Sequence, residues 1–420
     1  ERPTDMLLNA ITVEDGGDGQ FGPNDHLLFY ATGPHRWDRS GDDFVHTKNA
    51  YSDSASYFIG IDVDPPKRTA QTSQSSETPT TTVTSFKDRQ FIEFDLLNLL
   101  KSGRTWFGDL FDLTLTYNYS FSTPFLVPGS AASIRMTGAA RTIGTSNSSS
   151  FVITSGSNLN ETFTVGGVPE NYTSRYAYYF NNNFPFNPSG NTVPLTITFN
   201  KFNPVSSIGW LDYLELNCQR QLRMVGSQMI FRDPTSVAAG QISEFVLDQA
   251  QSIDRIWETS DPTNVRYLEY TTDGAYKRFT VQTDSLREFI AFRNSDVPAP
   301  TPIGQVPAQN LHATPAPMDL VIVCPPQFQG AASRLAERRI SEGLNVIIVS
   351  PQQVYNEFSC GARDATAIKR YMRMLYDKAT TPEEMPRYLL LFGDGSYNNL
   401  SQAQGNQNFI PSYQTKESLI

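Results

Sequence analysis

Cysteines, histidines and a Gly-Asp-Gly loop are the parts of this 420-residue sequence with the clearest capacity for chemistry. Cys360 lies in the short segment 359–361, and a thiolate nucleophile there would need a base or a helix N-terminus to lower the pKa of its thiol. The histidine nearest to it in sequence, His312, lies among prolines. We expect a mobile linker at that point, which could not hold a base against the thiol. Cys360 is therefore interpreted as a structural loop residue.

The other cysteines and histidines give weaker signals. Cys324 ends an apolar segment and Cys218 lies within another, which is typical of core residues. The three cysteines cannot all pair, and their spacing matches no zinc-ligand set. His26, His35 and His46 fall within the first fifty residues without helical spacing, so they do not predict a zinc site.

One acidic turn, at residues 14–19, is a candidate for metal binding. Asp15, Asp18 and Asp25 could hold calcium, because this cation prefers several carboxylate oxygens on a loop. Their spacing is not that of an EF-hand, and Asp and Gly also form turns for backbone reasons alone. We favour a plain turn and keep calcium as the alternative.

The Gly393-Asp394-Gly395 loop directly follows the apolar segment Tyr388 to Phe392. In parallel sheets, ligands and chemistry gather beyond the carboxyl ends of the strands. The two glycines allow the backbone to lie close to a ligand or a neighbouring loop. We expect the Asp394 carboxylate to accept a hydrogen bond from its own backbone. A phosphate-binding loop is a poor alternative, since no Lys and no helix follow.

Residues 318–395 show the periodicity of alternating strands and helices. Apolar runs predict three strands at Asp319–Val323, Asn345–Val349 and Tyr388–Phe392, the first of them buried on both faces. Apolar residues at helical spacing predict a helix over Phe328–Glu342 and a second one after Asp364, which can cap its N-terminus. Short connections then require parallel strands with right-handed crossovers. Because three strands leave a sheet edge bare, we expect more chain or a second chain to complete the sheet.

The region before this unit is predicted to be antiparallel β-structure, because short alternating runs recur between turn signals. The predicted fold class is therefore mixed: a β-rich, sandwich-like N-terminal region followed by the first half of an α/β three-layer domain. We expect an N-terminal β region with an acidic loop (1–64), a mobile Ser/Thr/Pro-rich loop (65–85), a β-sandwich-like region (86–295), a Pro-rich linker (296–317) and the incomplete α/β domain (318–420).

Composition and charge exclude some classes of protein. The chain is 39% hydrophobic and 18% charged, with a formal net charge of −10. From Met318 onward ten basic residues balance ten acidic ones, so the excess of acid lies in the β-rich region. An acidic surface argues against a nucleic-acid partner. No apolar run is long enough for a membrane-spanning helix. The chain begins with Glu1, and we expect that a signal peptide has been removed.

Several segments together resemble the gingipain-like cysteine peptidases, family C25, which have a caspase-like fold. The closest resemblance within that family is to the sortases of the type IX secretion system. In the α/β region the resemblance rests on Asp319–Val323, Asn345–Val349, Val354–Ser359 with Gly361 and Asp364, and Tyr388–Tyr397. In the β-rich region it rests on Asn24–Tyr30 before Trp37, Asn49–Asp53 before Tyr57-Phe58, Gly209–Tyr213 and Gln228–Arg232.

This resemblance implies a catalytic site that lies outside the sequence. The family's cysteine nucleophile and its histidine, usually within Gly-His-Gly, lie downstream of the Gly-Asp loop, and no position here matches them. No catalytic residue is therefore assigned. Gly393, Asp394 and Gly395 match the family's Gly-Asp loop at the edge of the substrate cleft. The fragment itself is expected to lack peptidase activity.

The resemblance also implies a function and partners for the complete protein. It would be a cell-surface cysteine endopeptidase and transpeptidase, associated with the outer membrane after its signal peptide is removed. It would cut the C-terminal sorting domain from secreted proteins and couple them to anionic lipopolysaccharide. Its other partners would be an outer-membrane β-barrel protein of the secretion machinery and the remainder of its own peptidase domain. The alternative is a non-catalytic β-sandwich scaffold or adhesin with a peptidase-like tail; the sequence after Ile420 would discriminate between them.

Overall fold

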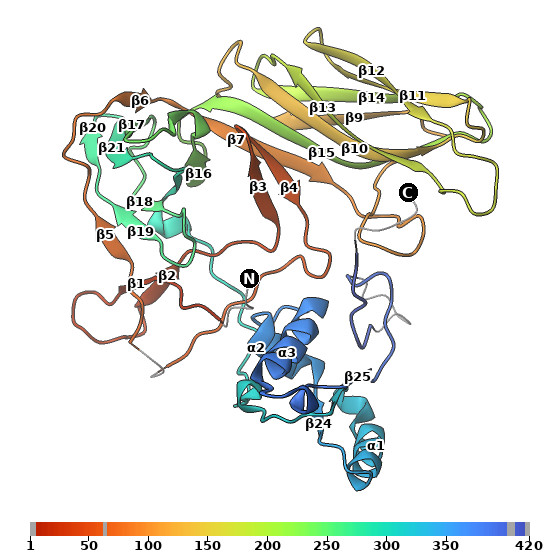
Figure 1. The fold of residues 1–420 in the computed structure, drawn as a ribbon. Helices are drawn as coiled ribbons and strands as arrows, with labels where there is room; N and C mark the ends of the chain where they lie inside the picture. The colour runs from red at the N-terminus through yellow and green to blue at the C-terminus, as the bar shows by residue number, and fades with distance from the viewer. Residues whose placement is uncertain (1–5, 62–64, 401–407, 416–420) are drawn as a thin grey trace.

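The chain folds into two β-sandwiches joined side by side, with a small α/β unit beneath them (Figure 1). The computed structural model describes residues 6–61, 65–400 and 408–415. Its mostly antiparallel sheets, followed by a partial parallel α/β unit, confirm the predicted fold class. No helix in the described part of the chain is both long and apolar enough to span a membrane.

The large sandwich consists of one sheet in the order β13-β10-β15-β7, with β8 paired to β15, and a second in the order β12-β11-β14-β9. Its strands alternate buried and exposed residues, because successive side chains point to opposite faces. Phe111, Phe151 and Phe199 fill the space between the sheets with no exposed surface. The strands are β7 (Ser85–Glu93), β8 (Leu110–Phe111), β9 (Thr116–Ser122), β10 (Ala132–Arg141), β11 (Ser148–Ser155), β12 (Leu159–Gly166), β13 (Tyr178–Phe186), β14 (Thr192–Asn200) and β15 (Ile208–Gln221).

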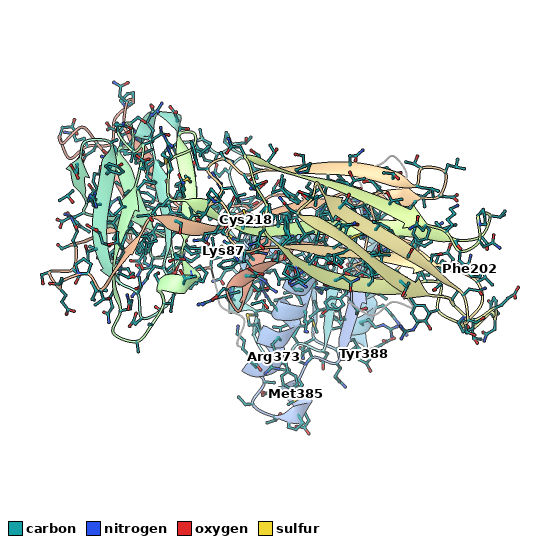
Figure 2. The ribbon with its side chains drawn as sticks, turned by 90° about the horizontal axis from the view of Figure 1, so that it is seen from above. Lys87, Phe202, Cys218, Arg373, Met385 and Tyr388 are labelled. Carbon is teal, nitrogen blue, oxygen red and sulfur yellow. The ribbon has the colours of Figure 1, made fainter. Side chains whose placement is uncertain are left out.

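The small sandwich has its own core of phenylalanines, including the stacked pair Phe245 and Phe279. Its sheets have the orders β16-β22-β18-β19-β5 and β20-β21-β17-β6. Lys87 and Cys218 mark the place where β7 and β15 pass from the large sandwich toward the small one (Figure 2). The strands are β5 (Ala70–Thr72), β6 (Thr81–Val83), β16 (Gln228–Arg232), β17 (Ile242–Leu247), β18 (Arg255–Glu258), β19 (Arg266–Leu268), β20 (Thr271–Asp273), β21 (Tyr276–Gln282) and β22 (Glu288–Phe292).

Two segments differ in structure from what the sequence predicted. Residues 65–85 are not simply a mobile loop, because β5 and β6 lie in them and pair in parallel with β19 and β17. Threonine is common both in linkers and in strands, so composition alone did not separate the two. Residues 86–295 also contain more than one hydrophobic core, because each of the two sandwiches has its own.

Residues 1–64 do not form a separate β region either. The hairpin β1 (Ile11–Glu14) and β2 (His26–Phe29) adds Leu28 to a core cluster shared with the small sandwich. The hairpin β3 (Arg36–Ser40) and β4 (Asp43–Thr47) lies against the large sandwich instead. There the backbone N–H of Phe44 donates to Asn217 Oδ1 at 2.8 Å, and that of His46 donates to Glu215 Oε2 at 2.6 Å.

The α/β unit is a three-stranded parallel sheet in the order β24-β23-β25, as predicted. Its elements are β23 (Leu320–Val323), α1 (Gln329–Ser341), β24 (Val346–Val349), α2 (Pro351–Phe358), α3 (Ala365–Lys378) and β25 (Tyr388–Leu391). Asp364 caps α3, and Gly343 has a φ of 92° just after α1, both as predicted. Helix α2 was not predicted; Ser350 and Gln353 start it through reciprocal side-chain bonds to the backbone.

The proline-rich linker has an exposed part and a bound part. Residues 298–308 are exposed and form neither helix nor strand. Just beyond them, the Glu357 carboxylate accepts hydrogen bonds from the backbone N–H groups of Leu311 and His312. Leu311 is buried in the core of the α/β unit. Short 3-10 turns complete the structure at η1 (Pro234–Ser236), η2 (Asn294–Asp296), η3 (Leu311–Ala313), η4 (Pro326–Phe328) and η5 (Pro382–Glu384).

We predict that limited proteolysis cuts within residues 298–308 before any other internal segment, because this backbone is exposed and outside any sheet or helix. Residues 70–72 and 81–83 should resist, since both are paired in sheets. Mass spectrometry of the first fragments identifies the site. Earlier cleavage at 65–85 would show that β5 and β6 are not stably paired.

Candidate functional site

The carboxyl edge of the parallel sheet gathers the ends of all three strands. Strand β23 leads into Pro325, β24 into Ser350 and β25 into Gly393. The N-terminus of α3 lies at the same edge, because this helix must return the chain to the start of β25. The Arg363 guanidinium, just before α3, donates to the backbone oxygen of Asn408. This edge is where parallel α/β sheets place their binding and catalytic groups.

The Gly-Asp-Gly loop at this edge is tightly backed by residues 408–410. A Cβ atom on Gly393 would lie 2.9 Å from Phe409 Cβ, and one on Gly395 would lie 2.6 Å from the Ile410 oxygen. Neither glycine has a positive φ, so close approach explains both. The Asp394 carboxylate is exposed and accepts a 2.9 Å hydrogen bond from the backbone N–H of Gly395. Asp394 thus has the local backbone bond that we expected; its catalytic relevance stays a prediction.

The chain that follows this loop is fastened to the large sandwich. The Tyr397 ring stacks on Trp106, with centroids 5.8 Å apart and planes 18° apart. The backbone N–H of Gln414 donates to Tyr51 Oη at 2.8 Å, and the N–H of Arg104 donates to the Thr415 oxygen at 3.1 Å. We call residues 393–400 and 408–415 the edge segment. It connects the carboxyl edge of the α/β sheet to the β-rich region.

Cys360 has a structural contact rather than a catalytic environment. Its thiol donates to the backbone oxygen of Ser56 at 3.2 Å, and burial raises the pKa of the thiol. Both effects oppose the thiolate that a nucleophile requires. Our expectation that His312 lies on a mobile linker is wrong: its Nδ1 lies 2.7 Å from Glu357 Oε2, and its ring stacks on Phe358. Its imidazole is thus paired with a carboxylate.

The other two cysteines are buried core residues, as predicted. Cys218 and Cys324 have no exposed surface, and none of the three cysteines forms a disulfide. Burial raises the pKa of the Cys218 thiol to about 12 and also raises the pKa of the Cys324 thiol. Neither thiol is suited to nucleophilic chemistry.

The candidate calcium ligands form local turns. Asp15 accepts from the N–H of Gly17 at 2.9 Å, Asp18 from that of Gln20 at 2.8 Å, and Asp25 from that of Gly22. Within the described residues, no group of three or more acidic, His or Cys side chains could hold a metal ion. The structure therefore supports the turn interpretation, and calcium binding stays an untested prediction.

A cavity of about 900 Å³, which the sequence analysis did not anticipate, lies between the hairpin β3–β4, the large sandwich and the edge segment. Glu93, Asp95 and Asp212 all line it, together with residues 398–400 of the edge segment. We call it the acidic cavity. The spacing of Glu93 and Asp95 was a usable signal, because residues two apart on an extended chain point to the same side. Asp212, far away in sequence, could be added only through the pairing of β15 with β7.

The carboxyl groups of the acidic cavity have strongly perturbed proton affinities. Burial, together with the nearby charge of Asp95, raises the pKa of Glu93 to about 7. Burial and the charge of Glu93 likewise raise the pKa of Asp212 to about 7, although Tyr179 Oη donates to it at 3.0 Å. Lys48 forms an ion pair with Asp95 at 2.8 Å. One partly buried cation thus faces three carboxyl groups, and the excess negative charge favours protonation of Glu93 and Asp212.

His46 lies in the same wall and its side chain is 1% exposed. Its ring stacks on Phe91 with centroids 3.6 Å apart. Nδ1 lies 3.2 Å from Glu93 Oε2, yet neither ring nitrogen has a hydrogen-bond partner of acceptable geometry. Burial lowers the pKa of His46 to about 4, so the ring is neutral at pH 7. His35 lies beside it, with ring centroids 5.9 Å apart.

Comparison with known proteins supports a peptidase-like assignment for the α/β unit. Residues 313–419 match the model of the family described as Peptidase family C25. This match covers the α/β unit and the edge segment, and it confirms the resemblance to gingipain-like cysteine peptidases there. A search of curated proteins gives no significant match.

Most of the chain has the fold of part of a solved structure, that of dimeric latent PorU from Porphyromonas gingivalis. The TM-score is 0.76 at 23% identity, and the match covers 94% of this chain and 37% of that chain. This chain therefore spans little more than a third of the PorU chain. A second solved structure that matches is the CBM36-1 domain of a multidomain xylanase from the hindgut metagenome of Trinervitermes trinervoides. Its TM-score is 0.21 at 12% identity, over 31% of this chain and 96% of that chain, and this likeness carries no argument.

We predict that Glu93→Gln makes stability less dependent on pH. The pKa of Glu93 is about 7 in the folded protein and about 4.5 in the unfolded chain, so the folded protein binds the proton more tightly. The resulting contribution to stability is fully present below pH 4.5 and is lost as pH rises through about 7. The lost contribution is on the order of 3 kcal/mol at most. The free energy of unfolding of the variant should thus exceed that of the wild type at pH 8 and approach it at pH 4.5.

Urea unfolding at pH 4.5 and pH 8 measures the difference in free energy of unfolding between variant and wild type. Asp212 and His46 are present in both proteins, so the comparison isolates the contribution of Glu93. Glu161→Gln, at an exposed position on β12, is the matched control and should leave the pH dependence as in the wild type. A constant difference between Glu93→Gln and wild type across this range would mean that Glu93 is already ionised at pH 5.

We predict that Gly395→Ala destabilises the chain by about 1–3 kcal/mol, because its Cβ would meet the backbone oxygen of Ile410. Gly330→Ala in α1 is the control, since nothing lies within 4 Å of the added atom there. Denaturant unfolding of both variants measures the effect. Equal stability of the two would contradict the close contact between the loop and residues 408–410.

Proposed function

We propose that this chain is the N-terminal part of a cell-surface cysteine peptidase of the gingipain type, which acts as a sortase of type IX secretion. The observation behind the proposal is the coincidence of two matches in one chain. Residues 313–419 match peptidase family C25, and the fold over 94% of the chain matches that of PorU. A β-sandwich scaffold would explain the second match only in part and the first not at all.

In this proposal the complete enzyme cuts a C-terminal sorting domain from secreted proteins. A cysteine thiolate attacks the scissile carbonyl and forms a thioester as the sorting domain leaves. Water or an amine then attacks the thioester and releases the thiol. Attack by water frees the cleaved protein, whereas attack by an amine of anionic lipopolysaccharide attaches the protein to it. The nucleophile and its histidine are contributed by the remainder of the peptidase domain. Cys360 is a poor nucleophile because its thiol donates a hydrogen bond to the backbone oxygen of Ser56 and because burial raises the pKa of the thiol.

The part played by this chain is to build and brace one side of the cleft. The Gly-Asp-Gly loop lies at the carboxyl edge, and the edge segment is fastened to the sandwich through Trp106 and Tyr51. Rigid support of this kind is what a catalytic group needs from its surroundings. We place the enzyme at the outer membrane, facing outward, with a β-barrel protein of the secretion machinery as its partner.

We predict that the 420-residue chain alone cleaves no peptide, and that the longer protein does so through a cysteine outside this chain. The test replaces each cysteine of the longer protein by alanine and follows release of the sorting domain from secreted proteins in cells. Loss of release should follow replacement of one cysteine beyond Ile420 and of a histidine in a Gly-His-Gly segment.

Cys360→Ala serves as the control within this chain and should leave release unchanged. Loss of release in Cys360→Ala, in a protein that folds normally by circular dichroism, would overturn the proposed position of the nucleophile. Release that persists when every cysteine and histidine beyond Ile420 is replaced would favour the scaffold instead.

A further inference from the structure

The acidic cavity has more buried negative charge than its own cations can balance. Lys48 is its partly buried cation, and it already pairs with Asp95 at 2.8 Å. The two arginines in the lining, Arg36 and Arg104, are exposed at its rim. Arg36 pairs with Asp38 at 3.0 Å. Within the described residues, neither Glu93 nor Asp212 forms an ion pair with a Lys or Arg, although the charge of Lys48 acts on Glu93 from a distance.

The neighbouring acidic groups are either paired or exposed to solvent, unlike Glu93 and Asp212. Glu215 lies close to the cavity but is balanced by Arg135 at 3.3 Å and by the backbone N–H of His46 at 2.6 Å. Asp53 lines the rim and is exposed to solvent. The unbalanced charge is thus local to Glu93 and Asp212.

A second and independent feature points to a missing ligand. His46 is almost fully buried in the cavity wall; its Nδ1 lies 3.2 Å from Glu93 Oε2, but neither ring nitrogen has a hydrogen bond of acceptable geometry. A buried polar group without a hydrogen bond destabilises the fold, so a ligand that supplies the bond would be favoured here. In the neutral imidazole one ring nitrogen is an acceptor, which an N–H donor from a ligand would satisfy.

The walls and size of the cavity also restrict the ligand. Aromatic side chains line it at Phe94, Trp106, Tyr179 and Tyr213. Such rings attract ammonium and guanidinium groups through their faces. The volume of about 900 Å³ lies within the range of cavities that hold small organic molecules or a few residues of a peptide. A bare metal ion is not favoured, because within the described residues no group of three or more His, Cys, Asp or Glu side chains could hold one.

From these contacts we propose that the acidic cavity binds an organic cation, with an ammonium or guanidinium group placed between Glu93, Asp212 and the ring of His46. Because the pKa values of Glu93 and Asp212 are raised to about 7, each carboxyl group is only partly ionised at pH 7. The protons that they still hold are released to solvent as the cation enters, so binding is coupled to proton release. The proposal does not depend on the peptidase assignment, because Glu93, Asp212 and His46 all lie in the β-rich region.

The test is isothermal titration calorimetry of the 420-residue chain with 1,4-diaminobutane and agmatine at pH 7. The expected result is saturable binding with net proton release, measured in two buffers of different ionisation enthalpy. 1,4-Butanediol has the same length and no charge, and it should not bind. Titration with a short lysine-containing peptide and with its acetyl-lysine form shows whether a protein side chain or a free amine is the better ligand.

Three variants locate the site. Glu93→Gln and Asp212→Asn should each weaken binding at least tenfold and reduce proton release, while Glu161→Gln should change neither. His46→Phe keeps the stack on Phe91 but removes both ring nitrogens, and it should weaken binding as well. Circular dichroism and thermal unfolding verify that each variant is folded. Absence of saturable binding by every amine and the lysine peptide, binding of butanediol equal to that of the diamine, or undiminished affinity in both acid variants would overturn the proposal.

Discussion

The attachment of the edge segment to the large sandwich is the contact on which the rest of the arrangement depends. Without it, the Gly-Asp-Gly loop would be held only by its own strand and by Phe409 and Ile410. The stack of Tyr397 on Trp106 and the bond from Gln414 to Tyr51 give this loop a fixed place relative to the β-rich region. One rigid edge is thereby built from two parts of the chain that are about three hundred residues apart.

The same attachment closes one side of the acidic cavity, since residues 398–400 belong both to the edge segment and to the cavity lining. The buried carboxyl groups therefore lie next to the chain that leads from the Gly-Asp-Gly loop. Their raised pKa values reflect lost solvation in a wall that the hairpin β3–β4 covers. Stability and ligand binding in this region are consequently both linked to protonation near neutral pH.

The sequence predicted what depends on local pattern and failed where distant segments meet. The three parallel strands of the α/β unit, the Asp364 cap and the turn at Gly343 follow from apolar runs and residue type, and all of them are present. Strand β25 lies at an edge of the sheet and is mostly exposed, so its apolar sequence did not predict its burial. Helix α2 was missed because its polar residues hide a short amphipathic face. The acidic cavity was missed because Asp212 meets Glu93 only through strand pairing, and His312 was misplaced because proline content hid its contact with Glu357.

Hydrogen exchange in Trp106→Ala tests most directly whether the sandwich holds the carboxyl edge. The account predicts faster exchange of the amides at 393–396 and 408–414 in this variant, while the strands of the large sandwich keep their protection. Tyr172→Ala is the matched control, because Tyr172 is a fully exposed aromatic residue on the same sandwich. Unchanged protection of 393–396 and 408–414 in Trp106→Ala would contradict the account, since the loop would then be held by the α/β unit alone.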